Sequence, residues 1–411
     1  MTEIVTLALV TASVIIVIGF LGNYLFKRTG LPDMLYLIAL GIVFGPILNV
    51  FDPASIMSLA PYLAALSLVI ILFDGGLRMN IYQVFSESPK AALLAILGFV
   101  VATITVTLFV HVVMGLPLVN GILFGTIYGG GGSSVAVLSL VTKIKINENT
   151  EVVLSLESVI DDILCVVGSL VVIGIIMTGY ADILIISRDI AGQFSIGAVI
   201  GVVFGVIWLS ILRRVAKEPY AYMLTLAVVL FGYTVSEYLG GSGALSSFLF
   251  GLVLGNEKDI FKILKRESSR SLIVDAGLRR LQEEIAFLIR SFFFVYLGLI
   301  AVSIDSYSLF WGIIISFLLL IIRFGVVKLA TIRSPYFKEH SLMTMMLTRG
   351  LVAAILATLP MQYGLLYADL YLNITLVVVI STAIINTVGV QVLSRRRAKN
   401  PEKPPQTNKL V

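Results

Sequence analysis

Apolar runs of about 20 residues recur along the whole chain, and they limit the folds open to it more than any other feature. A helix of that length crosses the ~30 Å hydrocarbon core of a bilayer. Composition agrees, since 58% of the 411 residues are hydrophobic and 13% are charged, whereas soluble domains carry about 25% charged residues. The sequence therefore predicts an all-α polytopic membrane protein.

Polar residues and Gly- or Pro-containing breaks divide the chain into thirteen candidate transmembrane spans. They cover residues 4–26, 33–49, 58–77, 90–114, 117–141, 150–177, 190–212, 219–239, 241–256, 281–302, 307–330, 340–361 and 370–393.

Lysine and arginine gather on the cytoplasmic side of membrane proteins, so their positions predict orientation. With the N-terminus outside and an odd number of spans, only Arg188 of the 29 basic residues falls in an outside loop. We therefore expect a multi-pass protein of the cell membrane whose C-terminus is cytoplasmic. The basic balance then reflects topology, and we expect membrane lipid and no nucleic acid as partner.

One transmembrane transporter domain is predicted over residues 1–397, with a cytoplasmic linker that carries an amphipathic segment at 257–284. Residues 398–411 hold three prolines and are predicted to form a short disordered cytoplasmic tail. No soluble regulatory domain is expected in the chain. The lone Cys165 cannot form an intrachain disulfide, and no cofactor or resident metal cluster is expected.

The sixth span contains the stretch LESVIDDIL, which places three carboxylates at membrane depth. An ionised side chain at the bilayer centre costs about 2.5–3.5 kcal/mol on the most lenient scale. Glu157 and Asp161 are four residues apart and share one helix face, while Ser158 and Asp162 form a neighbouring column. Paired acids in a low dielectric require a cation, and Arg323 and Arg349 are the deep candidates.

The column of Ser158 and Asp162 has a different chemistry, because a hydroxyl and a carboxylate are oxygen ligands that suit a hard cation. Burial disfavours the charged form of a carboxylate, so such a group binds a proton near neutral pH unless a metal ion replaces it. One site with two competing positive ligands is the chemistry of exchange.

The fifth span contains IYGGGGSSVAVL, with four consecutive glycines at residues 129–132. Each glycine costs a helix about 1 kcal/mol relative to alanine. A break at membrane depth is tolerated where the freed backbone lines a cavity. Gly132, Ser133 and Ser134 are therefore predicted to line such a broken-helix cavity, although close helix packing through small residues is the alternative.

These residues, with others in the same order, resemble the monovalent cation–proton antiporters, the sodium/proton exchanger superfamily of NhaP-like proteins. The similar stretches are LFDGGLRMN at 72–80, ESVIDD at 157–162, SFFFVYLGL at 291–299, IIRFGVV at 321–327 and TRGLVAAI at 348–355. Two positions depart from the usual family pattern. Asp161 stands where Asn is common, and Gly132, Ser133 and Ser134 stand where Thr-Asp-Pro is common.

The resemblance implies inverted six-helix repeats, broken and crossed fifth and twelfth spans, and a homodimer. It implies that Asp162 carries both cation and proton with Ser158 as its helper ligand, and that Glu157 and Arg349 form a supporting ion pair. The expected function is exchange of Na⁺, or of Li⁺ or K⁺, for H⁺ by alternating access, serving pH homeostasis, with no enzymatic activity.

Three other functions fit parts of the pattern. A K⁺/H⁺ antiporter uses the same ligands, and an ion channel or an organic-anion transporter of similar fold also contains membrane-embedded polar groups. An intramembrane aspartyl protease needs two aspartates on facing helices. Adjacent residues of one helix point about 100° apart, so Asp161 and Asp162 cannot form that dyad.

Overall fold

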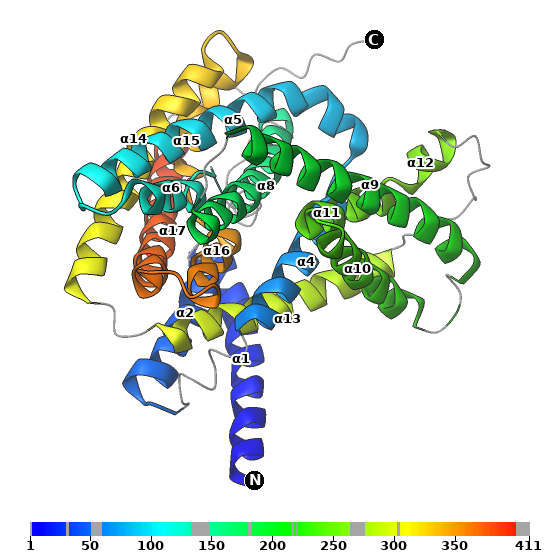
Figure 1. The fold of residues 1–411 in the computed structure, drawn as a ribbon, viewed down its shortest axis with the longest axis horizontal. Coiled ribbons are helices and arrows are strands. Elements are labelled where there is room, and N and C mark those ends of the chain that lie inside the picture. The colour runs from blue at the N-terminus through cyan, green and yellow to red at the C-terminus, as the bar shows by residue number, and fades with distance from the viewer. Residues whose placement is uncertain are drawn as a thin grey trace.

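The described part of the chain is helical throughout in a computed structural model (Figure 1). The structure describes residues 2–29, 33–50, 60–130, 132, 148–179, 183–215, 218, 220–263, 276–301 and 305–399. Its helices are α1 (Thr2–Thr29), α2 (Asp33–Ile42), the π-helix η1 (Val43–Ile47), α4 (Ala60–Arg78), α5 (Ile81–Val112), α6 (Leu118–Ile127), α8 (Glu148–Thr178), α9 (Ile183–Val215), α10 (Ala221–Tyr238), α11 (Gly243–Gly255), α12 (Glu257–Ile263), α13 (Ala276–Ile300), α14 (Ser306–Thr331), the 3₁₀-helix η2 (Pro335–Glu339), α15 (His340–Met345), α16 (Leu351–Gln362) and α17 (Ala368–Lys399).

Each predicted span overlaps a helix of the described residues, the fifth through α6 alone. The all-α membrane class is thereby confirmed, while the count of thirteen spans stays a prediction. Among the described residues, 6 helices are long and apolar enough to cross a membrane by length and composition. They are Pro89–Val112, Asn149–Thr178, Ala191–Val215, Ala221–Tyr238, Ser306–Thr331 and Ala368–Arg395.

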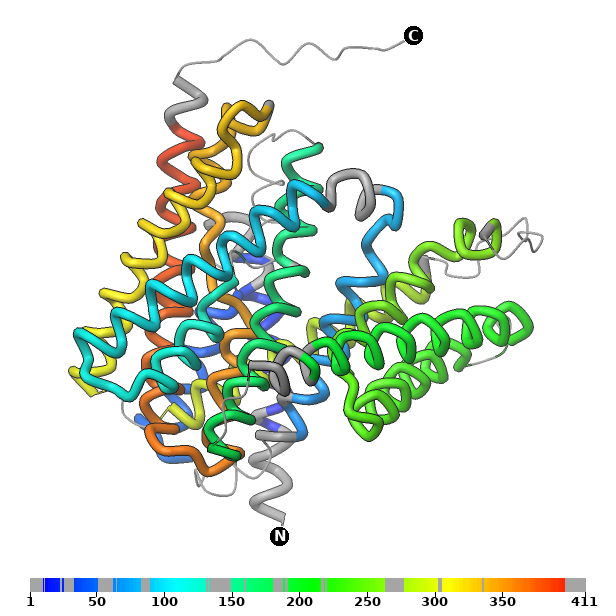
Figure 2. The backbone as a smooth tube through the Cα atoms, turned by 45° about the horizontal axis from the view of Figure 1, so that its top comes forward, coloured from blue at the N-terminus to red at the C-terminus, as the bar shows by residue number. Residues whose placement is uncertain are grey.

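The helices pack as two bundles, and Figure 2 shows the green helices α9, α10 and α11 of one bundle apart from the cyan, yellow and orange helices of the other. The support bundle comprises α1, α2, α4, α9, α10, α11 and α13, and α11 is its buried centre, packed between α4 and α9. The site bundle comprises α5, α6, α8, α14, α15, α16 and α17. Helices α8 and α16 make the contacts with the support bundle, so the acidic helix lies at the boundary of the two bundles.

Glycines permit the closest helix contacts of the support bundle. A Cβ atom on Gly76 of α4 would lie 2.0 Å from the carbonyl oxygen of Phe248 in α11. The contact is reciprocal, because a Cβ on Gly251 of α11 would lie 2.3 Å from the carbonyl oxygen of Phe73. Small residues let membrane helices approach at the backbone level, where van der Waals packing drives their association.

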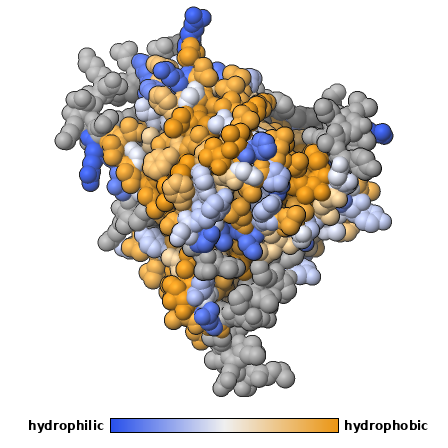
Figure 3. Space-filling model, turned by 60° about the vertical axis from the view of Figure 1, so that its left-hand side comes forward, coloured by the Kyte–Doolittle hydropathy of each residue, from blue (hydrophilic) through white to orange (hydrophobic). Residues whose placement is uncertain are grey.

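The outer surface is largely apolar, as the orange side chains of Figure 3 show on one face. Large hydrophobic side chains project outward from both bundles, among them Phe231, which is 61% exposed, and Ile321, which is 69% exposed. Such a surface is stable against lipid chains and not against water.

Two helices bear on the predicted boundaries. Helix α13 begins at Ala276, inside the predicted 257–284 segment, and Leu278 and Gln282 are buried at 2% and 3% exposure. The preceding part of the predicted linker contains α12 and residues outside the described ranges. Helix α17 continues to Lys399, two residues into the predicted tail, and the rest of the tail lies outside the described residues.

Candidate functional site

Helix α8 buries the predicted acidic columns. Glu157 and Ser158 are each 1% exposed and Asp161 is 2% exposed, while Asp162 is half-buried. The long apolar sequence of this helix keeps it continuous from Glu148 to Thr178, so the four side chains keep the predicted spacing of one turn. The structure therefore brings Glu157, Ser158, Asp161 and Asp162 together at the boundary of the bundles.

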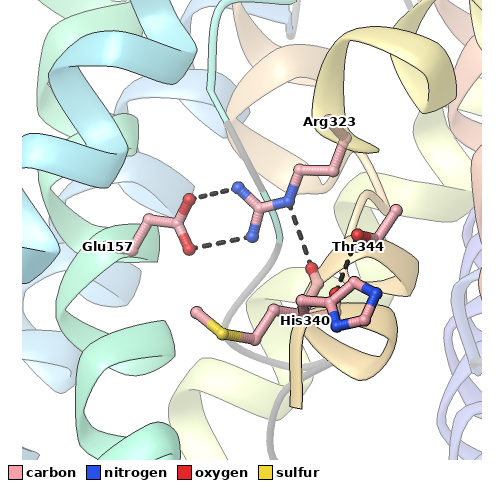
Figure 4. A network of polar contacts seen from close by, with 5 residues as sticks. Glu157, Arg323, His340 and Thr344 are labelled. Atoms are coloured by element: carbon pink, nitrogen blue, oxygen red, sulfur yellow. Dashed lines mark hydrogen bonds and ion pairs between the residues drawn. The ribbon is translucent and has the colours of Figure 1, made fainter. Parts of the chain in front are cut away.

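Glu157 forms a two-pronged ion pair with Arg323 of α14 (Figure 4). Arg323 donates from Nη1 to Oε1 and from Nη2 to Oε2, the latter over 2.9 Å. The pair is shielded from solvent, since the two side chains are 5% and 2% exposed. Parallel donation from a guanidinium to a carboxylate is among the strongest polar contacts in proteins.

Arg323 also joins a third helix to this pair. Its Nε donates to the carbonyl oxygen of Met343 over 3.2 Å. Met343 lies in the last turn of α15, and its carbonyl oxygen also accepts from Met346 N over 3.3 Å. One guanidinium thus connects α8, α14 and the short half-helix α15.

The resemblance implied a Glu157–Arg349 pair, whereas the ion pair that the structure shows for Glu157 is with Arg323. Arg323 on α14 faces Glu157 directly and satisfies both of its oxygens. Arg349 is 7% exposed and lies in the irregular segment between α15 and α16, where its backbone N–H donates to Thr382 Oγ1 over 3.1 Å. Its positive charge acts on Asp161 and Asp162. Both buried arginines therefore lie in the field of the acidic cluster, with the ion pair to Glu157 made by Arg323.

The helix of the fifth span ends just before the glycine run, where a break was predicted. Helix α6 ends at Ile127, and Gly130 follows in irregular backbone whose N–H donates to Cys165 Sγ over 3.1 Å. Gly132 lies against the second break, because a Cβ atom there would come within 2.4 Å of the carbonyl oxygen of Met346. Ser133 and Ser134 lie outside the described residues.

The second break separates α15 from α16 at residues 346–350. It confirms the broken twelfth span that the resemblance implied. Gly132 and Met346 therefore approach each other at backbone distance. Breaks at membrane depth present free backbone groups to a cavity or an ion.

Helix α17 fixes both breaks, and sequence reasoning missed this role. Tyr128, at the end of α6, is fully buried and its hydroxyl lies 2.7 Å from Thr375 Oγ1. Thr382, seven residues further along α17, accepts the hydrogen bond from Arg349 N. The signal was present, because hydroxyls spaced by seven residues share one face of an otherwise apolar span.

The arrangement suits a small cation better than a multivalent metal. Ser158 Oγ is buried and has no hydrogen-bond partner among the described residues, so it is available as an oxygen ligand beside Asp162. Groups of three or more His, Cys, Asp or Glu side chains that could hold a metal ion do not occur within the described ranges. A site whose oxygen ligands include one carboxylate that can gain or lose a proton fits a monovalent ion or a proton.

The family described as "Sodium/hydrogen exchanger, transmembrane" matches residues 12–396 of the chain. The chain belongs to this family. The sodium/hydrogen exchanger assignment confirms the resemblance seen in the five motifs.

Individual relatives of this chain are named as antiporters. The chain is 28% identical over 387 residues to the K⁺/H⁺ antiporter NhaP2 of Shewanella sp. (strain ANA-3), covering 92% of this chain and 65% of that protein. It is 25% identical over 293 residues to Na⁺/H⁺ antiporter 1 of Methanocaldococcus jannaschii, covering 69% of this chain and 66% of that protein. The chain thus spans just under two thirds of the length of these relatives.

The fold is also that of a solved antiporter. The structure of the sodium proton antiporter MjNhaP1 from Methanocaldococcus jannaschii at pH 8 superposes with a TM-score of 0.78. The superposition covers 95% of this chain and 99% of that one, at 21% sequence identity. The predicted sodium/proton antiporter fold is therefore confirmed.

Proposed function

We propose that this protein is a secondary active antiporter that exchanges a monovalent cation, Na⁺ first, for H⁺ across the cell membrane. The observation that carries the proposal is the column of buried Ser158 and half-buried Asp162 on α8, beside a deep arginine and the close approach of Gly132 to Met346. Membership of the exchanger family supports it.

In the proposed mechanism, Asp162 binds either a cation or a proton, and Ser158 Oγ supplies a second oxygen ligand when the cation is bound. Arg323 neutralises Glu157, and the Arg349 charge faces Asp161 and Asp162. Because a guanidinium does not release its proton, both arginines stay charged throughout. The binding of one ligand then expels the other, and alternating access of the site couples the two fluxes.

The net charge moved per transport cycle depends on which of these charged groups exchanges a proton. We propose that Asp161 stays ionised in the field of Arg349, which leaves Asp162 as the one group that alternates between proton and cation. One proton exchanged for one monovalent ion moves no net charge, so the exchange is electroneutral.

K⁺ is the second candidate substrate. The relatives of Shewanella and Alkalimonas amylolytica are named K⁺/H⁺ antiporters, and their similarity extends over 92% and 96% of this chain. The ligand types do not separate the two ions, since both accept carboxylate and hydroxyl oxygens. We further propose that the N-terminus lies outside and the C-terminus in the cytoplasm, on the distribution of Lys and Arg. We also propose a homodimer, on the resemblance to the antiporter family.

The test is proton flux in proteoliposomes that contain a pH-sensitive dye, with Na⁺, Li⁺ and K⁺ added in turn. The proposal expects alkalinisation of an acid interior on addition of at least one of these cations, dependent on the protein. Cation current without a change in internal pH would instead indicate a channel and contradict the proposal.

A further inference from the structure

The chain passes from the support bundle to the site bundle through a link of two residues. Helix α4 ends at Arg78 and α5 begins at Ile81, so Met79 and Asn80 make the crossing. Helix α4 packs on α11 and α13, whereas α5 packs on α6, α8 and α14. The other crossings, from α8 to α9 and from α13 to α14, run partly through residues outside the described ranges.

So short a link restricts how the bundles can move. Each residue of extended chain spans at most about 3.6 Å, so two residues allow little separation of the helix ends they join. Rotation about the link remains possible, because hinges absorb motion in the φ and ψ angles of a few residues at element ends. The Met79–Asn80 link therefore lies where a hinge between the two bundles would be, although Ile81 itself packs on the support bundle.

One side chain from the support bundle forms hydrogen bonds with the backbone of this link. Asn256, which follows the last residue of α11, accepts a hydrogen bond from Ile81 N over 2.8 Å. Its Nδ2 donates over 2.7 Å to the carbonyl oxygen of Met79 and over 2.7 Å to that of Leu252. The side chain is buried, and it bonds the backbone on both sides of Asn80.

The end of α4 is fixed to the support bundle by a second contact. Arg279 of α13 donates from Nη1 to the carbonyl oxygen of Leu77 over 2.9 Å. Asn80 Oδ1 accepts from Tyr82 N over 2.9 Å and so caps the start of α5. Side chains thus hold the backbone groups on either side of the link. The φ and ψ angles of Met79 and Asn80 are what can still rotate.

We propose that Asn256 is a positioning residue that fixes the pivot about which the site bundle turns against the support bundle. The inference rests on the proposed function, since antiport by alternating access requires such a movement. The primary amide is specific to the task because it donates and accepts at once. A hydrophobic side chain of the same size leaves Met79 O and Ile81 N–H unpaired.

The test compares Asn256→Leu, and the milder Asn256→Ser, with the matched control Ser247→Ala. Ser247 is equally buried on α11, but its hydroxyl bonds Gly243 O of its own helix over 2.9 Å. The hydrogen-exchange rate of the Ile81 amide reports its hydrogen bond to Asn256 directly. We expect this rate to rise at least ten-fold in both Asn256 variants and to stay unchanged in the control. The maximal exchange rate in proteoliposomes should fall several-fold, with the cation concentration at half-maximal rate unchanged.

Spin labels measure the pivot without any transport. Labels at Phe231→Cys on α10 and Ile321→Cys on α14 sit on exposed positions of the two bundles, while Cys165 is buried. We expect Asn256→Leu to broaden the distribution of label distances about two-fold and Ser247→Ala to leave it unchanged.

The outcomes separate the two proposals. A wild-type protein that exchanges no cation contradicts the proposed function, and the label distances then decide on the pivot alone. A faster-exchanging Ile81 amide with wild-type transport rate and an unchanged distance distribution overturns the pivot and leaves the antiport proposal intact.

Discussion

Removal of Arg323 should lower the free energy of unfolding more than removal of any exposed charge, because it leaves the buried Glu157 carboxylate without its ion-pair partner. Replacing it by methionine strands the Glu157 carboxylate, whose side chain is 2% exposed. Breaking a buried pair by removing one partner costs about 3–5 kcal/mol. The variant also loses the hydrogen bond to Met343 O, worth about 1 kcal/mol. We therefore expect Arg323→Met to cost about 4–6 kcal/mol in total.

A double-mutant cycle separates the pair from other effects of the substitution. Glu157→Gln alone leaves a buried guanidinium without its neutralising carboxylate, and it should cost about 3–5 kcal/mol. The double variant buries no unpaired charge, since replacement of a buried pair by neutral groups is often nearly neutral. We expect it to be more stable than the sum of the single losses by more than about 2 kcal/mol.

The assay is the free energy of unfolding, measured by reversible titration with sodium dodecyl sulfate in mixed micelles. The control is Arg280→Met, which removes one partner of the exposed pair with Glu284, with side chains 82% and 63% exposed. Such a surface pair contributes at most about 1 kcal/mol. Losses in Arg323→Met and Glu157→Gln that add to within about 0.5 kcal/mol in the double variant would refute the reasoning.

Three further outcomes follow from the two helix breaks and the charge distribution. Gly132→Ala places a Cβ atom against Met346 O and should lower the exchange rate at least ten-fold. The control Gly174→Ala, with open space around its Cβ, should keep the wild-type rate. Equal rates for the two variants would contradict the close approach of Gly132 to Met346. Tyr128→Phe removes the bond to Thr375 and should cost about 1 kcal/mol of unfolding free energy, and no loss would mean that the bond is unimportant. Sodium-driven exchange in proteoliposomes should not respond to a potassium–valinomycin potential, and a several-fold rise would mean that a second acid carries charge.

The sequence predicted the acidic helix and its columns because both depend on local geometry. Glu157 and Asp161 lie one turn apart in any α-helix, so the need for a deep cation followed from the pattern alone. The break after Ile127 was equally local, since four glycines in succession disfavour a helix wherever they occur.

Which side chains of different spans form ion pairs depends on tertiary packing, and no local sequence pattern predicts it. Arg323 and Arg349 are both deep and both permanently charged, so nothing local decides which of them meets Glu157. The break between α15 and α16 was implied only by the resemblance, because a single Gly350 in an apolar run is compatible with an unbroken helix. Asn256 had no distinguishing pattern, since its partners Met79 and Ile81 are 175 or more residues away.

The most direct test of the account is the proton flux of Asp162→Asn in proteoliposomes with a pH-sensitive dye. An amide cannot exchange a proton for a cation, so we expect no cation-dependent flux from a protein that melts at the wild-type temperature. The control is Asp369→Asn, an exposed acid in the first turn of α17, which should keep the wild-type rate. Cation-dependent flux above a tenth of the wild-type rate in Asp162→Asn would contradict the claim that Asp162 carries both ions.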